Sequence, residues 1–376
     1  MVEPQPLPLP REDAPVPAPV GRARRVLMRR LADVVCLPSS RVNAFERAMT
    51  ADLLVEILHD AEPADRLRVA QRLSGLRDIP SPLARLLLAD AFEVAAPLLA
   101  EGTGLSDPDL IFCIARTTPD HRRLIASRRD VSESVAEALA ASTDLPVIEV
   151  LLKNVEARLS GAALETILGL SRQTPALVAG LLRRGELRPA QAYNLFWWAG
   201  PNERGTILQR FAVSREILQD SSADIFRLCT EEGWQDPLVR KALQFIERRQ
   251  RNRAAIAKSP FESLDEAVAA AAGGMTREIA EEVSYLAGVK PMTGARIFTD
   301  PLGEPIAILC KATGLPRAAV LALWRGLKRP EADSSGAMTP ALERTLITYD
   351  IMAVDRAQTV LRYWNWSMAT GAPPTA

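Results

Sequence analysis

The pattern that decides the fold begins with LSDPDLIFCIAR at residues 105–116 and returns 26 residues later as VSESVAEALAAS at residues 131–142. It recurs as LSGAALETILGL at residues 159–170 and LRPAQAYNLFWW at residues 187–198. Aligning these segments gives five anchors spaced 26, 26, 28 and 28 residues apart: Ile79, Leu105, Val131, Leu159 and Leu187. A repeat of this length is typical of stacked helical hairpins, each of which buries its apolar face against its neighbours.

The positions inside each repeat predict two short helices. Residues 5, 8, 9 and 12 positions after each anchor lie on one face of a helix, and the first three are mostly apolar. The twelfth position is always small, and we expect it to let the next helix approach closely; these residues are Ala91, Thr117, Thr143, Ser171 and Ala199. Ser106, Ser132 and Ser160 follow their anchors, where a hydroxyl can cap a helix. A second apolar pair, such as Leu98-Leu99, closes each repeat. A helical bundle without a repeat is the alternative, but five repeats that agree at four positions disfavour it.

The sequence therefore predicts an all-α protein with a HEAT-like helical-hairpin repeat, a short α-solenoid, followed by a smaller helical domain. Composition and breaks in the pattern suggest six segments: a disordered Pro-rich arm (1–20), N-terminal helices that cap the repeat (21–78), the repeats (79–236), a basic linker helix (237–258), a C-terminal helical domain (259–370) and a disordered tail (371–376). The arm is rich in proline and alanine, which favours a solvated or polyproline conformation.

Composition limits the classes of function. The 376-residue chain has a formal net charge of +0, which argues against a protein whose main role is to coat nucleic acid or an acidic membrane. Four scattered cysteines and the lack of a C-x-x-C motif suggest neither a zinc knuckle nor a disulfide framework. Because the sequence shows no signal peptide and no apolar run long enough to span a bilayer, we expect a cytoplasmic protein.

The repeats contain four candidate partner-binding residues. Trp197 and Trp198 lie in the most aromatic part of the repeats. Packing within the core is their ordinary role, but an exposed tryptophan pair would be a good binding hot spot. Arg122 and Arg123 follow His121, which we expect at the surface of an interhelical turn.

Two segments could instead contact nucleic acid. The basic helix carries Arg248, Arg249, Arg251 and Arg253, which could form a phosphate-contacting patch. Residues 306–313 and 316–327 are spaced like a helix-turn-helix. Only two side chains of the second helix, Arg317 and Arg325, could reach a groove, so an ordinary helical hairpin is the simpler interpretation.

No catalytic, cofactor-binding or metal-binding residue can be assigned from motifs. The two histidines, His59 and His121, have no carboxylate at metal-ligand spacing, and no Gly-rich phosphate loop or nucleophile elbow occurs. We therefore expect a protein that is not an enzyme and uses no cofactor.

Four stretches of the chain resemble a known bacterial family: residues 25–34, 93–99, 105–110 and 121–126. They are similar to proteins grouped as domain of unknown function 2336, which in turn resemble HEAT-type helical repeats. The resemblance covers roughly residues 22–330 and implies an all-α fold in a cytosolic bacterial protein. It implies no activity and no catalytic residues.

Together these observations favour a non-enzymatic interaction or regulatory scaffold that binds an unidentified protein in the groove of its repeats. The alternative is a nucleic-acid-associated regulator that uses the basic helix and the hairpin. Both interpretations rest on fold-level analogy.

Overall fold

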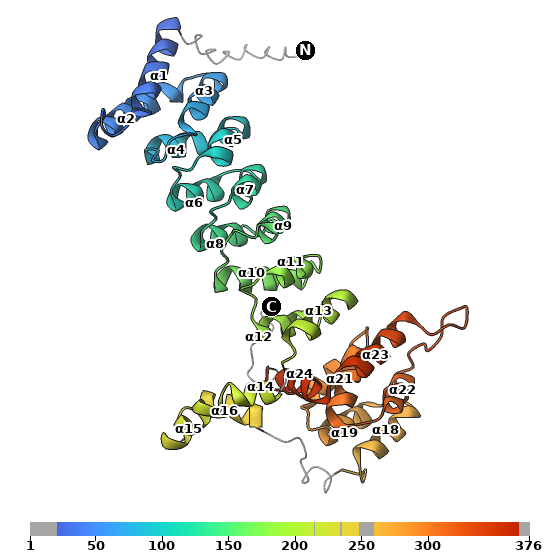
Figure 1. Cartoon of the computed structure of the whole chain (residues 1–376). Coiled ribbons are helices and arrows are strands. Elements are labelled where there is room, and N and C mark those ends of the chain that lie inside the picture. Colours follow the sequence, from blue (N-terminus) through green and yellow to red (C-terminus); the bar gives the residue numbers. More distant parts are fainter. Residues whose placement is uncertain (1–20, 214, 234, 248–258, 368–376) are drawn as a thin grey trace, which may run out of the picture. The chain divides into compact units, whose positions relative to one another are not determined.

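The computed structural model describes residues 21–213, 215–233, 235–247 and 259–367, and these residues form 23 helices (Figure 1). They contain no strand, and their only β-type pairing is an isolated bridge between Ala332 and Met338. The described part of the chain is therefore all-α, as the sequence predicts. The chain divides between Leu170 and Ser171 into two compact units, called unit 1 and unit 2 below, and this division falls inside the range predicted to hold the repeats.

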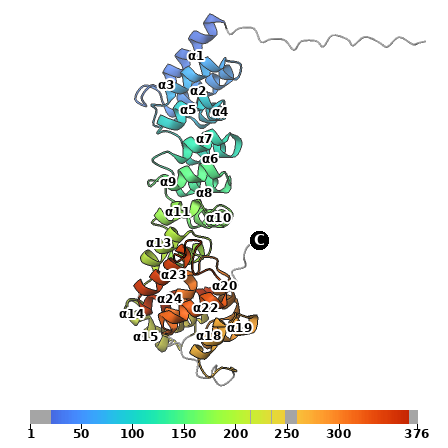
Figure 2. The same ribbon diagram turned by 90° about the vertical axis from the view of Figure 1, so that its right-hand side faces the viewer.

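Unit 1 is built from short helices in pairs. Its helices are α1 (Arg22–Val35), α2 (Ala44–His59), α3 (Pro63–Leu73), α4 (Ser81–Leu88), α5 (Phe92–Glu101), α6 (Asp107–Arg116), α7 (Pro119–Ala126), α8 (Glu133–Ala141), α9 (Leu145–Lys153) and nearly all of α10 (Gly161–Ser171). From α4 on, consecutive helices pair as α4 with α5, α6 with α7 and α8 with α9. Each helix from α1 to α7 also packs on the helix two places further along, so that odd-numbered and even-numbered helices form two rows (Figures 1 and 2).

The predicted apolar face is the core of these pairs. The residues 5, 8 and 9 positions after every anchor are buried, from Ala84, Leu87 and Leu88 in α4 onward. The twelfth position lies outside the helix in four of the five repeats, because α4, α6, α8 and α12 end before it, and only Ser171 is inside its helix, α10. Ala91, Thr117 and Thr143 lie in the turns between helices, where a small residue suits the turn rather than a helix contact.

Serine capping is realised in two of the three predicted places. Ser132 accepts a hydrogen bond from the Val135 backbone N–H (3.3 Å), and Ser160 accepts one from Ala163 (3.1 Å). Ser106 instead donates to Asp109 Oδ2 (2.5 Å). Serine is thus used at the repeat starts both for the backbone and for a carboxylate.

A recurrent side-chain donor joins consecutive repeats. Arg128 donates to the carbonyls of Leu99 (2.6 Å) and Gly102 (2.7 Å), at the end of α5. Asn154, which is 26 residues later, donates to the carbonyls of Ala126 (2.9 Å) and Arg128 (2.6 Å), at the end of α7. Because the last carbonyls of a helix have no partner within it, each such residue satisfies the helix end of the preceding repeat.

Unit 2 is organised around one buried helix. Its helices are α11 (Leu177–Arg183), α12 (Pro189–Leu195), α13 (Pro201–Phe211), α14 (Arg215–Asp220), α15 (Ala223–Glu231), α16 (Pro237–Glu247), α18 (Leu264–Ala272), α19 (Arg277–Leu286), α20 (Pro291–Thr299), α21 (Glu304–Thr313), α22 (Arg317–Gly326), α23 (Pro340–Ile351) and α24 (Val354–Ser367). Eight of the ten residues of α21 are buried, and α20, α22, α23 and α24 pack around it. A helix that is apolar on most sides is placed at the centre of a domain.

A buried ion-pair network links distant parts of unit 2. The Arg204 guanidinium of α13 donates to both carboxylate oxygens of Asp300 (2.5 and 2.8 Å) and to Glu304 Oε2 (2.9 Å). All three side chains are buried: those of Arg204 and Asp300 are 2% exposed, and that of Glu304 is 4% exposed. The same guanidinium lies over the Phe196 ring, 4.6 Å from its centroid.

Two helix boundaries in the C-terminal segment differ from those that the sequence predicts. The prolines and glycines of residues 290–305 predict a loop with a short helix at 295–298, but α20 spans Pro291–Thr299. Gly294 lies inside this helix because α19 approaches closely there: a Cβ at this position would lie 1.8 Å from Ser284 Oγ. The sequence after Thr339 predicts one last helix to about residue 368, but the helix breaks after Ile351, and both resulting helices pack on α21.

Candidate functional site

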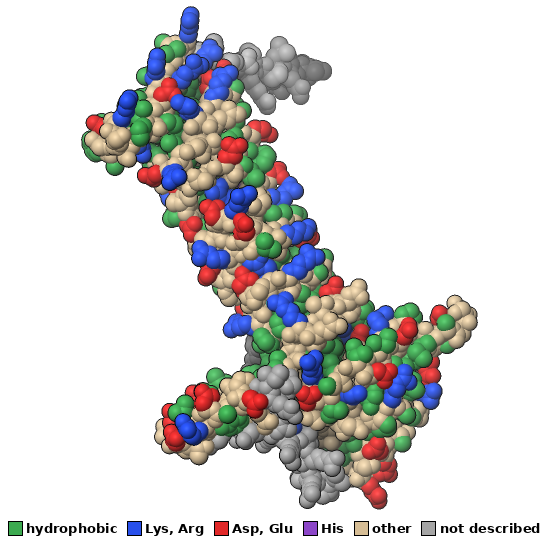
Figure 3. All heavy atoms as spheres, viewed as in Figure 1, with side chains coloured by type: hydrophobic (Ala, Val, Ile, Leu, Met, Phe, Trp, Pro, Cys, Tyr) green, Lys and Arg blue, Asp and Glu red, His purple; other side chains and the backbone are tan. Residues whose placement is uncertain are grey.

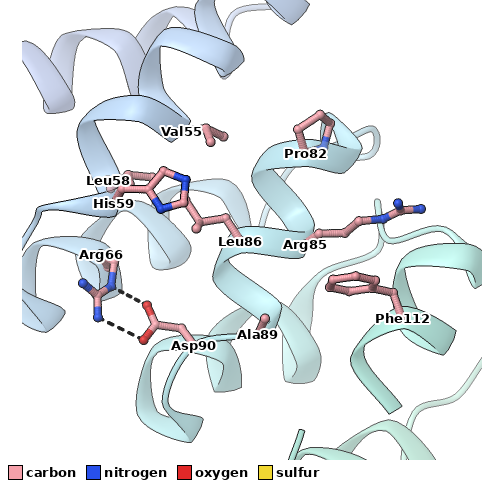
Figure 4. A pocket seen from close by; sticks show the side chains of 10 residues that line it. All are labelled: Val55, Leu58, His59, Arg66, Pro82, Arg85, Leu86, Ala89, Asp90 and Phe112. Carbon is pink, nitrogen blue, oxygen red and sulfur yellow. Dashed lines mark hydrogen bonds and ion pairs between the residues drawn. The ribbon is translucent and has the colours of Figure 1, made fainter. Parts of the chain in front are cut away.

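An open groove lies between the even-numbered helices at the start of unit 1, and we call it the α2–α4–α6 groove (Figure 4). Its volume is about 510 Å³. It is lined by Val55, Leu58, His59, Arg66, Pro82, Arg85, Leu86, Ala89, Asp90 and Phe112. The lining combines apolar side chains with a small number of charged ones, a composition typical of binding sites.

The outward face of α4 forms the floor of this groove. Pro82, Leu86 and Ala89 are spaced by four and three residues, so they lie on one side of the helix. The other side of α4 carries the buried residues of the repeat core. Leu86 and Phe112 stand seven positions after their anchors, a position that the core pattern does not use.

The charged side chains of the groove are held by neighbouring groups. Arg66 donates two hydrogen bonds to the Asp90 carboxylate, one of them 3.0 Å long, and a third to the Ala61 carbonyl (2.5 Å). Arg85 donates to Oδ1 of the buried Asp109 (2.8 Å). These contacts fix the guanidinium groups before any ligand arrives, which reduces the entropy lost on binding.

The Phe112 ring is flanked by basic side chains. The Cζ atoms of Arg85 and Arg116 lie 5.3 and 4.7 Å from its centroid. Such cation–π contacts favour a fixed position of the ring. The groove thus has a preformed aromatic wall on α6.

The two histidines have different surroundings. His59 is exposed at the end of α2 and lines the groove. His121 was expected at the surface, but it is buried: Nδ1 lies 2.8 Å from the Thr118 hydroxyl oxygen and Nε2 lies 3.1 Å from the Asp90 carbonyl oxygen. The edge of its ring also packs on Phe92. His121 therefore helps to position the turn whose carboxylate holds Arg66.

A second groove lies between two odd-numbered helices, and we call it the α1–α3 groove. Its volume is about 930 Å³, and it is lined by Arg22, Arg25, Val26, Met28, Arg29, Ala32, Asp33, Asp65, Arg68, Val69 and Arg72. Five arginines thus face two aspartates. Figure 3 shows basic side chains gathered over the α1 end of unit 1.

The predicted tryptophan pair makes contacts inside unit 2. The ring centroid of Trp197 lies 4.7 Å from that of Trp364, and the Arg296 guanidinium carbon lies 4.5 Å from the Trp197 centroid. Trp198 donates its Nε1–H to Ser171 Oγ (3.0 Å). Both tryptophans are half-buried, and their role in partner binding stays a prediction.

The other predicted partner-binding pair lies on α7. Arg122 donates to the Ile114 carbonyl (2.9 Å), and Arg123 pairs with Asp120 one turn earlier. Neither residue lines one of the two grooves of unit 1. Their role in partner binding also stays a prediction.

The predicted nucleic-acid-binding residues are placed in part. The hairpin forms as α21 and α22, and Gly314 adopts φ +79° in its turn. Arg317 pairs with Asp350 (3.2 Å) and Arg325 pairs with Glu331 (2.5 Å). The first part of the predicted basic helix is α16, while Arg248, Arg249, Arg251 and Arg253 lie outside the described residues.

The cysteines are free thiols. Burial raises the pKa of Cys36, Cys113 and Cys310, most strongly at Cys310 in the centre of unit 2. The neutral thiol is the favoured form at these positions. In the described part of the chain, no His, Cys, Asp and Glu side chains cluster in threes or more to hold a metal ion. None of its helices is long and apolar enough to span a membrane.

These features define an all-α protein made of paired helices, with open grooves on its surface. The chain belongs to a bacterial family described as "uncharacterised protein conserved in bacteria", domain of unknown function 2336 (DUF2336), whose family model matches residues 94–362. The family predicted from the sequence is therefore confirmed. The match begins at residue 94 instead of near 22, so the stretch 25–34 lies outside it, and it ends at residue 362 instead of near 330. Comparison with curated proteins and with solved structures gives no match.

The motif search missed both grooves, although the sequence holds a signal for the first. A large apolar residue stands seven positions after the anchor in the first two repeats, at Leu86 and Phe112. The later repeats carry Ala138, Thr166 and Asn194 there. A large apolar residue outside the core positions marks an exposed face, and this contrast between repeats locates the groove.

Proposed function

We propose that the protein is a non-enzymatic interaction or regulatory scaffold that binds a segment of a partner protein in the α2–α4–α6 groove. The observation that supports it is the combination of an apolar floor, Leu86 and Phe112, with a rim of guanidinium groups that are already oriented by carboxylates. Preformed apolar pockets with oriented polar groups bind peptide side chains with a small entropy loss.

The arrangement of unit 1 supports this role. We infer that its two rows of helices form a short α-solenoid, because each helix from α1 to α7 packs on the helix two places further along. Such repeats present extended surfaces to protein segments. The four free cysteines support a reducing compartment, and we propose that the protein works in the cytoplasm.

The test is selection of a displayed library of linear peptides on the full-length protein, followed by affinity measurement with the Leu86→Asp variant. A carboxylate in the floor should weaken binding of the selected peptides at least about tenfold, because it places an unpaired charge in an apolar contact. Val155→Asp is the matched control, since Val155 is 85% exposed and lies outside the groove. We expect this control to bind like the unmodified protein.

Hydrogen exchange completes the test. A bound peptide should slow amide exchange in α4 and α6, and circular dichroism should show that both variants keep their helical content. Peptides that bind both aspartate variants equally, or that protect helices away from the groove, would contradict the proposal.

A further inference from the structure

The α1–α3 groove has an excess of positive charge that no described residue neutralises. Asp65 pairs with Arg68 (2.6 Å), and Asp33 pairs with Arg72 (3.2 Å). Both carboxylates of the groove are therefore engaged by α3. Within the part of the chain that the structure describes, Arg22, Arg25 and Arg29 form no ion pair. Three positive charges of α1 remain available to a ligand.

The three arginines lie on one side of α1. Their spacing of three and four residues places them in a line along the helix. Between Arg22 and Arg29 the helix rises about 10 Å, which is about two turns of a partner helix. A ligand that follows this line needs anionic groups with the same spacing.

The floor of the groove is apolar. Met28, Ala32 and Val69 are buried beneath it, and Val26 is 53% exposed beside the arginines. A ligand that fills the groove should therefore carry an apolar stripe next to its anionic groups.

We propose that the α1–α3 groove binds an acidic amphipathic helix of a partner protein, with carboxylates at helical spacing opposite Arg22, Arg25 and Arg29. An amphipathic helix supplies both an apolar stripe and a line of charge, as helix-in-groove complexes do. A nucleic acid backbone carries a line of charge but has no apolar stripe. A membrane surface would not follow a concave groove. The site is separate from the α2–α4–α6 groove, so this proposal does not depend on the proposed function.

The experiment uses the full-length protein and two labelled synthetic peptides about five helical turns long. Both peptides carry the same leucine stripe; one has Glu and the other Lys at positions i, i+3 and i+7. Fluorescence anisotropy should show binding of the Glu peptide, with affinity that falls as salt is added, and weaker binding of the Lys peptide.

Charge reversal provides the decisive comparison. In the variant Arg22→Glu/Arg25→Glu/Arg29→Glu, affinity for the Glu peptide should fall at least about tenfold, because three exposed ion pairs are lost and replaced by like-charge repulsion. The same variant should now prefer the Lys peptide. If the helical content of this variant falls, it is replaced by Arg25→Ala and Arg29→Ala, which only truncate exposed side chains. Both replacements should also weaken binding of the Glu peptide.

The matched control is Arg41→Glu/Arg129→Glu/Arg183→Glu, which changes the net charge equally at exposed positions outside the groove. It should retain the affinity of the unmodified protein. Equal loss in both triple variants, or no binding of the Glu peptide, would overturn the proposal. So would tighter groove-dependent binding of a single-stranded oligodeoxyadenylate or of vesicles of phosphatidylglycerol and phosphatidylcholine.

Discussion

A buried tyrosine, Tyr193, and a half-buried one, Tyr363, link the stability of unit 2 to pH. Tyr193 donates its hydroxyl hydrogen to the Phe211 carbonyl (2.6 Å), and its ring centroid lies 4.8 Å from that of Tyr363. Burial raises the pKa of Tyr363 to about 12 and raises the pKa of Tyr193 still further. Both phenols therefore stay neutral in the folded protein at pH values where an exposed phenol ionises.

We expect the free energy of unfolding to fall as pH rises above about 10, the pKa of an unperturbed tyrosine. The unfolded state then loses phenolic protons that the folded state keeps, so alkali favours unfolding up to the folded-state pKa. Below pH of about 10 both states keep these protons, so the contribution of the two tyrosines to the free energy of unfolding is fully present. Tyrosinate absorbance should show the late titration, and urea denaturation at several pH values should show the stability loss.

The variant Tyr363→Phe removes one of these groups. It should make the decline in stability between pH of about 10 and 12 less steep, whereas Tyr285→Phe, at an exposed residue of α19, should leave the slope unchanged. Equal slopes in all three proteins would contradict the assignment.

In unit 2, the close packing of α22 on α18 depends on a glycine, as the packing of α20 on α19 does at Gly294. Gly326 lies at the end of α22, where a Cβ would come within 2.0 Å of the Ala271 carbonyl oxygen of α18. The Gly326 carbonyl also accepts a hydrogen bond from Met275 N (2.8 Å). The approach of α22 to α18 therefore requires a residue without a side chain.

Gly326→Ala and Gly169→Ala should have opposite effects. The first should lower the free energy of unfolding by about 1–3 kcal/mol, because the helices must separate to accept the methyl group. The second should raise it by about 0.5–1 kcal/mol, because Gly169 is inside α10 with open space around its Cβ position. Urea denaturation followed by circular dichroism measures both changes. A stabilised Gly326→Ala variant would show that the contact can relax without cost.

Periodicity predicts helices and their buried faces, but not the contacts made by single side chains. The core positions of the repeats were predictable because burial of an apolar face leaves a regular pattern in sequence. Helix α20 was not predictable in this way, because a glycine such as Gly294 occurs in loops as well as in helices that make a close contact, here with Ser284. Asn154, Arg128 and His121 act through backbone carbonyls that only the folded chain brings near, so no motif marks them.

The grooves show the same limit. The sequence search looked for catalytic and metal-ligand spacing, whereas the α2–α4–α6 groove is defined by surface residues of three separate helices. Leu86 and Phe112 could have been found by their shared position in the repeat, but the ion pairs that orient Arg66 and Arg85 could not.

Inside each compact unit, the stabilising contacts join residues at a different separation along the sequence. In unit 1 the helices pack on neighbours one or two places along the chain. In unit 2 the Arg204 network joins residues 96 and 100 positions apart. Nearest-neighbour contacts allow local opening, whereas a long-range network makes distant helices open together.

Arg204→Ala should therefore disturb several separate helices of unit 2 at once. It leaves the Asp300 carboxylate buried without its cation and leaves Glu304 only its longer pair with Arg344 (3.9 Å), and loss of one partner of a buried ion pair costs about 3–5 kcal/mol. Amide hydrogen exchange should accelerate in α13, α20 and α21, while α4–α9 keep their protection because every ion pair of Arg204 lies inside unit 2. Arg227→Ala breaks an exposed pair with Glu231 and is the control, with an expected effect below about 1 kcal/mol. Faster exchange throughout both units of the Arg204 variant would show instead that the whole chain unfolds cooperatively.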